Sequence, residues 1–96
     1  MKKRIEDLIV VENRHLNSEF FVLKLHSLQG LPEIMPGQFA EVKVDGSSST
    51  FLRRPISIYN VDYSSNTLEL LIKIVGNGSA KLATLNHKEI LNLIYP

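Results

Sequence analysis

Leu52-Arg53-Arg54-Pro55-Ile56-Ser57-Ile58 decides the interpretation of this chain, because two adjacent cations and a proline interrupt a segment with the apolar pattern of a β-strand. Arginine carries a planar, permanently charged fork that suits phosphate, and proline removes one N–H from the sheet ladder. Two interpretations follow. The segment either binds a planar ligand that carries phosphate, or it is an edge strand protected from aggregation by charge and proline.

Length and composition limit the classes of protein to consider. With 96 residues the chain makes one domain with a single modest core, too short for a second, nucleotide-binding domain. The formal net charge is +1, so no overall electrostatic attraction favours nucleic acid or an anionic membrane. An anion would therefore have to be bound locally.

Several kinds of chemistry are disfavoured by what the sequence contains. Cysteine is absent, so this chain supplies no disulfide, thiolate metal site or iron–sulfur ligand. The three histidines lack metal-like spacing with carboxylates, and no serine has a partner histidine in a nucleophile motif, so neither a metal site nor a catalytic residue is predicted.

The N-terminus does not resemble a targeting segment. Residues 1–4 are basic, but Glu6 and Asp7 follow before any apolar run of signal-peptide length, and nothing later approaches a membrane span. We interpret Glu6 and Asp7 as the solvated start of a strand. A soluble, cytoplasmic protein is expected.

Apolar residues recur in short bursts separated by turn residues, which is typical of β-strands. In one burst, Phe21, Leu23 and Leu25 alternate with more polar residues, whereas the register of residues 39–44 stays open. Residues 13–18 are predicted as a loop and 63–66 as a turn. Six strands are predicted, at residues 5–12, 20–25, 39–44, 51–59, 67–75 and 90–95. They indicate an antiparallel sheet or barrel.

Gly76-Asn77-Gly78-Ser79 follows the fifth predicted strand. Ser79 is the expected N-cap of a short helix, and backbone N–H groups at a helix start provide an anion site in principle. Most such turns merely connect a strand to a helix, so this motif alone does not decide the function. The helix would carry Ala80, Leu82, Ala83 and Leu85.

Three stretches and their spacing carry a resemblance that covers essentially the whole chain. They are Met35-Pro36-Gly37-Gln38-Phe39, the Leu52 to Ile58 stretch quoted above, and Lys73-Ile74-Val75-Gly76-Asn77-Gly78-Ser79. With them the chain resembles the flavin-binding domain of the ferredoxin reductase superfamily, most closely the electron-transfer subunits of bacterial NAD-dependent dihydroorotate dehydrogenase. Arg-Pro-Ile-Ser about twenty residues before Gly-x-Gly-Ser is the most specific part.

The resemblance implies an all-β fold: a six-stranded antiparallel Greek-key barrel with one short helix, which binds FAD over residues 1–96. It places Arg54 at the pyrophosphate, Ser57 beside the polar edge of the isoalloxazine, and Gly78 and Ser79 in a phosphate-binding turn. The implied cofactor-binding residues are Arg54, Pro55, Ile56, Ser57, Leu71, Ile72, Lys73, Gly78 and Ser79.

Physical chemistry agrees with these implied roles. A bidentate arginine and helix N-terminal amides are complementary ways to hold pyrophosphate, and an exposed strand edge can hydrogen-bond the flavin pyrimidine. The isoalloxazine also needs a flat apolar platform, to which Ile56, Ile58 or Tyr59 could contribute. The protein would position the flavin and tune its potential, with Ser57 as the candidate for that tuning.

The chain departs from the family in a few places. Lys73 stands where arginine is frequent and Ser79 where threonine is usual, so the charge and the hydroxyl are kept. Asn86-His87-Lys88-Glu89 lacks the Gly-Asp turn common in relatives. Relatives continue past a proline like Pro96 into a glycine-rich nucleotide domain and the cysteines of a 2Fe–2S cluster. We therefore expect an FAD module without NAD-binding and iron–sulfur portions, which alone would lack turnover.

In full-length relatives the resemblance implies electron transfer between NAD(H), FAD, the cluster and the catalytic subunit of dihydroorotate dehydrogenase, in pyrimidine synthesis. Neither nucleic acid nor a membrane is an expected partner, whereas apolar barrel surface left without a second domain predicts self-association. The alternative is a cofactor-free interaction module such as an oligonucleotide-binding barrel, which needs interleaved basic and aromatic residues on one face. The few aromatic residues are expected mostly in the core.

Overall fold

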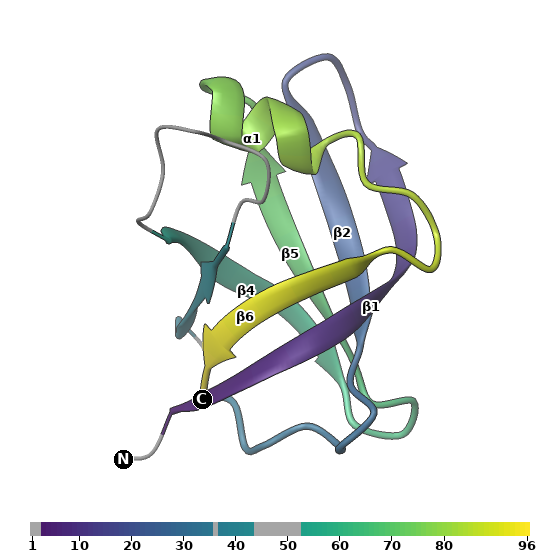
Figure 1. The fold of residues 1–96 in the computed structure, drawn as a ribbon, viewed down its shortest axis with the longest axis vertical. Coiled ribbons are helices and arrows are strands. Elements are labelled where there is room, and N and C mark those ends of the chain that lie inside the picture. Colours follow the sequence, from purple (N-terminus) through teal and green to yellow (C-terminus); the bar gives the residue numbers. More distant parts are fainter. Residues whose placement is uncertain (1–2, 36, 44–52) are drawn as a thin grey trace.

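The structure, a computed structural model, describes residues 3–35, 37–43 and 53–96, which form a closed antiparallel barrel of six strands and one short helix (Figure 1). The elements are β1 (Arg4–His15), β2 (Phe20–His26), β3 (Phe39–Val42), β4 (Arg54–Asp62), β5 (Thr67–Lys73), α1 (Asn77–Leu82) and β6 (Ile90–Tyr95).

The strand order around the barrel is β1-β2-β5-β4-β3-β6. Because β3, β4 and β5 are consecutive neighbours and β6 returns to lie beside β3, the topology is a Greek key. The predicted fold class is therefore confirmed. In Figure 1 α1 lies over one end of the barrel, and the two termini lie together at the other.

The barrel interior is filled by one face of each strand except β4, whose inward side chains are only half-buried. On β2, Phe21, Leu23 and Leu25 are buried as predicted, but Val22 on the other face is buried as well, so the alternation is incomplete. On β3, Ala40 and Val42 are buried whereas Phe39 is exposed. Val44, at the end of that predicted strand, lies outside the described residues. The core consists of Leu8, Val10, Phe21, Leu23, Leu25, Ala40, Val42, Leu68, Leu70, Ile72, Leu82, Leu91, Leu93 and Tyr95.

β1 is longer than predicted. Residues 13–15, predicted as part of a loop, pair with residues 21–23 of β2, beyond a bulge between Val10 and Glu12. The loop prediction was wrong for these residues because pairing with a neighbouring strand overrides their polar composition. β4 likewise continues to Asp62, and the turn at residues 63–66 follows as predicted.

α1 begins earlier than predicted. Gly76 is its N-cap, so the prediction of Ser79 as N-cap was wrong, and Ser79 is the third helical residue. Its hydroxyl oxygen nevertheless accepts hydrogen bonds from the amides of Val75 at 2.8 Å and Gly76 at 3.2 Å. Ser79 therefore caps the helix by reaching back from its first turn, as the third residue of a capping box does.

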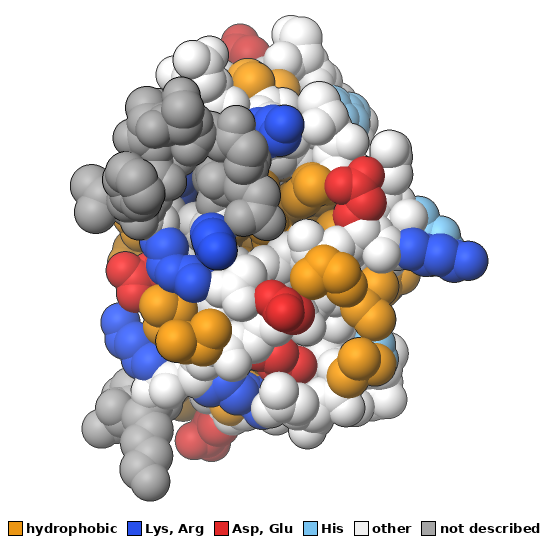
Figure 2. Space-filling view, in the orientation of Figure 1, with side chains coloured by type: hydrophobic (Ala, Val, Ile, Leu, Met, Phe, Trp, Pro, Cys, Tyr) orange, Lys and Arg blue, Asp and Glu red, His pale blue; other side chains and the backbone are white. Residues whose placement is uncertain are grey.

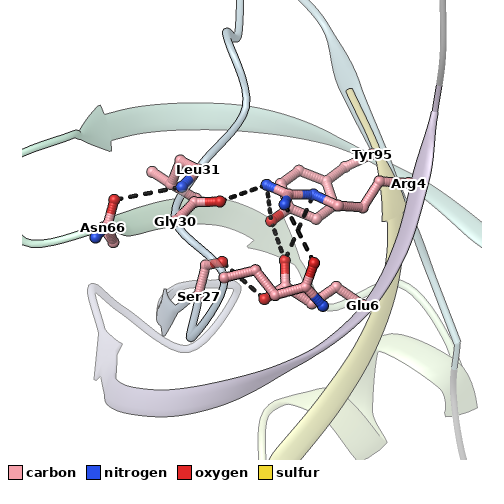
Figure 3. A network of polar contacts seen from close by, with 8 residues as sticks. Arg4, Glu6, Ser27, Gly30, Leu31, Asn66 and Tyr95 are labelled. Atoms are coloured by element: carbon pink, nitrogen blue, oxygen red, sulfur yellow. Dashed lines mark hydrogen bonds and ion pairs between the residues drawn. The ribbon is translucent and has the colours of Figure 1, made fainter.

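A buried carboxylate joins three segments at the end of the barrel near the termini (Figure 3). Glu6 accepts hydrogen bonds from the hydroxyls of Tyr95 at 2.5 Å and Ser27 at 2.7 Å. The guanidinium of Arg4 lies 3.7 Å from the same carboxylate and donates to the carbonyl oxygen of Gly30. The interpretation of Glu6 as a solvated residue was therefore wrong, because donors from other segments replace the water around its carboxylate.

This network predicts a loss of stability at high pH. Burial, followed by the hydrogen bond to Glu6, raises the pKa of Tyr95 from 10.0 to about 12. Since the unfolded chain ionises this phenol first, the stabilisation is complete below pH 10 and is lost as the pH rises through about 12. We expect the free energy of unfolding to fall by about 2 kcal/mol over that interval in urea titrations. Tyr95→Phe should remove this part of the pH dependence, and an unchanged profile in that variant would contradict the assignment.

The turn at residues 86–89 uses a left-handed backbone conformation at a residue with a side chain. Lys88 has a φ of 79°, and its amide donates to the carbonyl oxygen of Val10 at 2.8 Å, which holds the turn against β1. Glycine adopts this conformation without the steric cost that other residues bear. We therefore expect Lys88→Gly to raise the free energy of unfolding by about 0.5–1 kcal/mol in urea denaturation.

The matched control for that prediction is Lys81→Gly in α1. Because glycine is unfavourable inside a helix, this variant should lose about 1 kcal/mol. Equal losses in both variants would contradict the role assigned to the φ of Lys88.

Candidate functional site

The ladder between β4 and β5 opens toward α1. Pairing of these strands runs from Asp62 opposite Thr67 to Ile58 opposite Leu70. In the described part of the chain, residues 54–57 pair only with β3, and residues 71–73 pair only with β2. β4 is thus no edge of an open sheet, but its first four residues have one side without a strand partner.

This opening forms a cavity of about 390 Å³, a volume suited to a small molecule. All nine residues predicted to bind a cofactor line it, and they come from three different elements. β4 contributes Arg54, Pro55, Ile56 and Ser57; β5 contributes Leu71, Ile72 and Lys73; and α1 contributes Gly78 and Ser79.

Sequence reasoning missed three further lining residues, Val75, Gly76 and Leu82. Gly76 and Val75 belong to the connection between β5 and α1, and Leu82 was predicted only as an apolar residue of the helix. Leu82 is buried and also belongs to the core cluster, so it joins the cavity wall to the barrel interior. Gly76 is the first residue of the Gly-x-Gly-Ser motif and Val75 directly precedes it, so the motif itself was the signal for both.

The charged side chains that line the cavity are cations. The side chain of Arg54 is exposed and forms no hydrogen bond or ion pair with any residue that the structure describes. Lys73 is also exposed, with its Nζ 5.8 Å from the ring centroid of Phe20. Among the described residues that line the cavity there is no carboxylate. The free fork of Arg54 is therefore available to an anionic ligand.

The neighbouring arginine has a different role. Arg53 is half-buried, and its guanidinium donates to the carbonyl oxygens of Glu41 and Asn92, each at 3.3 Å. It also donates to the side-chain oxygen of Asn92. Arg53 therefore braces β3 and β6 and does not line the cavity, which separates the two arginines of the motif into a structural and a free one.

The cavity has an apolar wall on the barrel side. Of the three residues considered as a platform, only Ile56 lines it. Ile58 pairs with Leu70 where the ladder is closed, and Tyr59 is 57% exposed and does not line the cavity. The rest of this wall comes from the side chains of Leu71, Ile72, Leu82 and Val75.

Several aromatic side chains lie outside the core. Phe39, Tyr59 and Tyr63 are 57%, 57% and 52% exposed, so the expectation that aromatic residues lie mostly in the core was wrong. Phe39 lies on β3 opposite Ser57, and its neighbour Ala40 is buried, so Phe39 occupies the outer face. Strand parity, rather than hydrophobicity, decides the exposure of this residue.

The α1 end of the cavity supplies backbone donors. The amides of Asn77, Gly78 and Ser79 belong to the first turn and have no acceptor within the helix. Because α1 has only six residues, its dipole is small, and these N–H groups are the main contribution of the helix start. The hydroxyl of Ser79 is already used within the turn, as described above.

Two further features bear on the class of site. Within residues 3–35, 37–43 and 53–96, no group of three or more His, Cys, Asp or Glu side chains could hold a metal ion. The described helix is too short and insufficiently apolar to cross a membrane.

Comparison with known proteins identifies the family. A family model for the oxidoreductase FAD-binding domain matches residues 7–94. The dihydroorotate dehydrogenase B (NAD(+)), electron transfer subunit, of Lysinibacillus sphaericus (strain C3-41) is 36% identical over 93 residues, which cover 97% of this chain and 36% of that protein. The chain thus spans about a third of the length of that curated relative.

Solved structures show the same fold. Phthalate dioxygenase reductase, described as a modular structure for electron transfer from pyridine nucleotides to 2Fe–2S, superposes with a TM-score of 0.76 at 19% identity, over 93% of this chain and 28% of that one. A ferredoxin NADP+ reductase from Neisseria gonorrhoeae with bound FAD and NADP gives 0.71 at 18% identity, over 94% and 36%. The solved structures thus share the fold, and the family model, which matches residues 7–94, shows that the chain belongs to the oxidoreductase FAD-binding domain family.

Proposed function

We propose that the cavity between β4, β5 and α1 holds the FAD of this domain. The single observation that carries the proposal is the open β4–β5 ladder, whose unpaired strand sides and free arginine face one cavity. A protein that needed only a closed barrel would continue the ladder to the ends of both strands. The opening instead leaves backbone groups and a cation for a ligand.

The pyrophosphate would lie at the cationic side of the cavity. Arg54 supplies a two-pronged donor, and Lys73 on the opposite strand supplies a second charge. The backbone amides of Gly78 and Ser79 add donors that need no charge. These groups come from both strands and the helix, so they would hold the phosphates from several directions.

The isoalloxazine would lie against the apolar wall. Ile56, Leu71 and Ile72 supply apolar contact, and the exposed hydroxyl of Ser57 supplies a polar contact at the rim. When bound, FAD supplies the redox chemistry. The residues of this chain bind and orient it and exclude water from one face of the ring, and no acid–base step is assigned to them.

We further propose that residues 1–96 are the FAD-binding portion of a dihydroorotate dehydrogenase electron-transfer subunit acting in the cytoplasm. The support is the relative of that name at 36% identity. In such a protein NAD and the 2Fe–2S cluster would be held by portions outside residues 1–96. The partner would be the catalytic subunit of dihydroorotate dehydrogenase, in pyrimidine synthesis.

Self-association of the isolated chain is a separate proposal. On the face built by β1 and β6, hydrophobic side chains are exposed in groups separated by charged ones (Figure 2). Ile5 and Ile90 are 65% and 51% exposed there. Light scattering tests the proposal, since a monomer at all concentrations would contradict it.

Titration of the purified chain with FAD tests the main proposal. We expect saturable one-to-one binding by calorimetry, with quenching of the flavin fluorescence. A parallel titration with single-stranded DNA tests the alternative of an oligonucleotide-binding barrel. Salt-dependent binding of DNA by a folded sample that does not bind FAD would overturn the proposed function.

A further inference from the structure

One wall of the cavity is formed by α1, a helix that needs contacts with the barrel to be stable. α1 has six residues, and helices of this length are not stable on their own. Gly78, Ser79 and Leu82 of α1 all line the cavity. The shape of the site therefore depends on the contacts that hold α1 against the barrel.

The contacts at the two ends of α1 differ in kind. At its start, the hydroxyl of Ser79 accepts from the amides of Val75 and Gly76 and donates to the carbonyl oxygen of Gly76, and both residues belong to the connection that directly precedes the helix. At its end, the side-chain Nδ2 of Asn13 on β1 donates to the carbonyl oxygens of Ala83 and Leu85, at 2.9 Å each. Carbonyl groups at a helix end have no partner within the helix, so Asn13 supplies the donors that they lack.

Apart from this amide, apolar packing and one histidine hold the end of α1. Leu82 is buried in the core, and Ala83 and Leu85 pack against it. His15 places its Nε2 3.2 Å from the carbonyl oxygen of Ala83 and stacks on the ring of Phe21. Asn13 contributes two of the three side-chain contacts to these carbonyls, and Ala83 directly follows the cavity residue Leu82.

The bulge in β1 places Asn13 beneath the helix. Before the bulge the even-numbered residues Leu8 and Val10 are buried, whereas after it Glu12 is exposed. The extra residue reverses the alternation, so Asn13 lies opposite the buried Leu23 on β2. Without the bulge the carboxylate of Glu12 would face the helix carbonyls.

Burial of the Asn13 side chain also carries an unfavourable desolvation free energy, which its two hydrogen bonds must offset. Its Oδ1 is buried and has no hydrogen-bond partner among residues 3–35, 37–43 and 53–96. An apolar side chain of similar size would avoid that cost, so the donors are what this residue provides at this position.

We propose that Asn13 is a positioning residue of the flavin site. Its hydrogen bonds to the carbonyl oxygens at the end of α1 fix the helix that forms one wall of the cavity. The proposal rests on the proposed function for its effect on FAD, but not for its effect on α1. The described hydrogen-bond partners of the Asn13 side chain are Ala83 and Leu85, and neither residue lies on β4 or β5 or lines the cavity. Its influence on the ligand would pass through Ala83 and Leu82.

Two variants of Asn13 test the proposal in the full chain. Asn13→Leu and Asn13→Asp both keep the approximate size and remove the two donors. The matched control is Asn60→Leu, since Asn60 lies on β4 outside the cavity and its Nδ2 donates to Glu69 at 3.3 Å. FAD affinity is measured by calorimetry, well below the unfolding temperature of every variant. We expect binding about tenfold weaker in both Asn13 variants and unchanged in the control.

Amide hydrogen exchange without FAD provides the second readout. The amide of Ala83 donates to the carbonyl oxygen of Ser79 at 3.1 Å, so its exchange reports on the opening of α1. The amides of Leu82 and Ala83 should exchange about tenfold faster in the Asn13 variants, relative to those of Leu23 and Leu70 in the core. Failure of the natural chain to bind FAD would contradict the proposed function, and the exchange data would still decide whether Asn13 holds α1. FAD affinity equal to that of the natural chain, or unchanged exchange in α1, would overturn the proposal, even if the unfolding temperature fell.

Discussion

Arg54→Ala should weaken FAD binding by about 10- to 100-fold, because it removes charge-assisted hydrogen bonds to the pyrophosphate. Arg54 has no partner among the described residues, so its loss should leave the barrel intact. Arg54→Lys keeps the charge and loses the fork, and we expect an intermediate affinity. Calorimetric titration of each variant with FAD measures the effect.

Riboflavin and a second arginine provide the controls for this prediction. Riboflavin has no phosphate, so Arg54→Ala should bind it as the natural chain does. Arg14→Ala removes an exposed arginine on β1 that pairs with Glu12 at 3.1 Å and does not line the cavity. This variant should bind FAD normally. Equal losses for FAD and riboflavin would contradict a pyrophosphate contact at Arg54.

Tyr95→Phe should lower the free energy of unfolding by about 2 kcal/mol, because it leaves the buried carboxylate of Glu6 without one of its donors. The hydroxyl of Ser27 and the guanidinium of Arg4 would remain beside that carboxylate. Removal of one partner from a buried polar network lowers the free energy of unfolding by more than the net contribution of the hydrogen bond, because the remaining group stays buried without that donor. Urea denaturation at neutral pH measures the change.

Tyr63→Phe is the matched control, since it makes the same substitution at an exposed site. The hydroxyl of Tyr63 accepts a hydrogen bond from the amide of Ile34 at 3.0 Å and is open to water, so its loss should cost less than about 1 kcal/mol. The FAD affinity of Tyr95→Phe should not change, because the network lies at the end of the barrel opposite α1 (Figure 1). Equal losses of stability in the two variants would contradict the importance of the buried network.

Features that depend on local pattern were predicted well. The alternation of Phe21, Leu23 and Leu25 predicted a strand that buries these three side chains, and the structure confirms it. The strand at 90–95 was predicted with the observed bounds. The motif residues of β4, β5 and α1 were predicted from family resemblance to share one site, and they line one cavity, although their role in binding stays a prediction.

Features that depend on contacts between distant residues were not predicted. Asn13 looked like a loop residue because its partners, Ala83 and Leu85, lie about seventy positions away in the sequence. Glu6 looked solvated because the hydroxyl that binds it comes from Tyr95, at the other end of the chain. A bulge or a buried carboxylate leaves no periodic signal in the sequence, so only the folded structure reveals it.

Mapping of backbone amide chemical shifts during an FAD titration tests the central claim most directly. We predict that the largest changes fall on Ser57, Lys73, Gly78 and Ser79, which line the cavity from three segments. The amides of Lys24 and Thr67, at a smaller polar hollow elsewhere on the barrel, should change little. Changes centred on Lys24 and Thr67, with none at Ser57 and Gly78, would show that FAD binds elsewhere and would contradict the account.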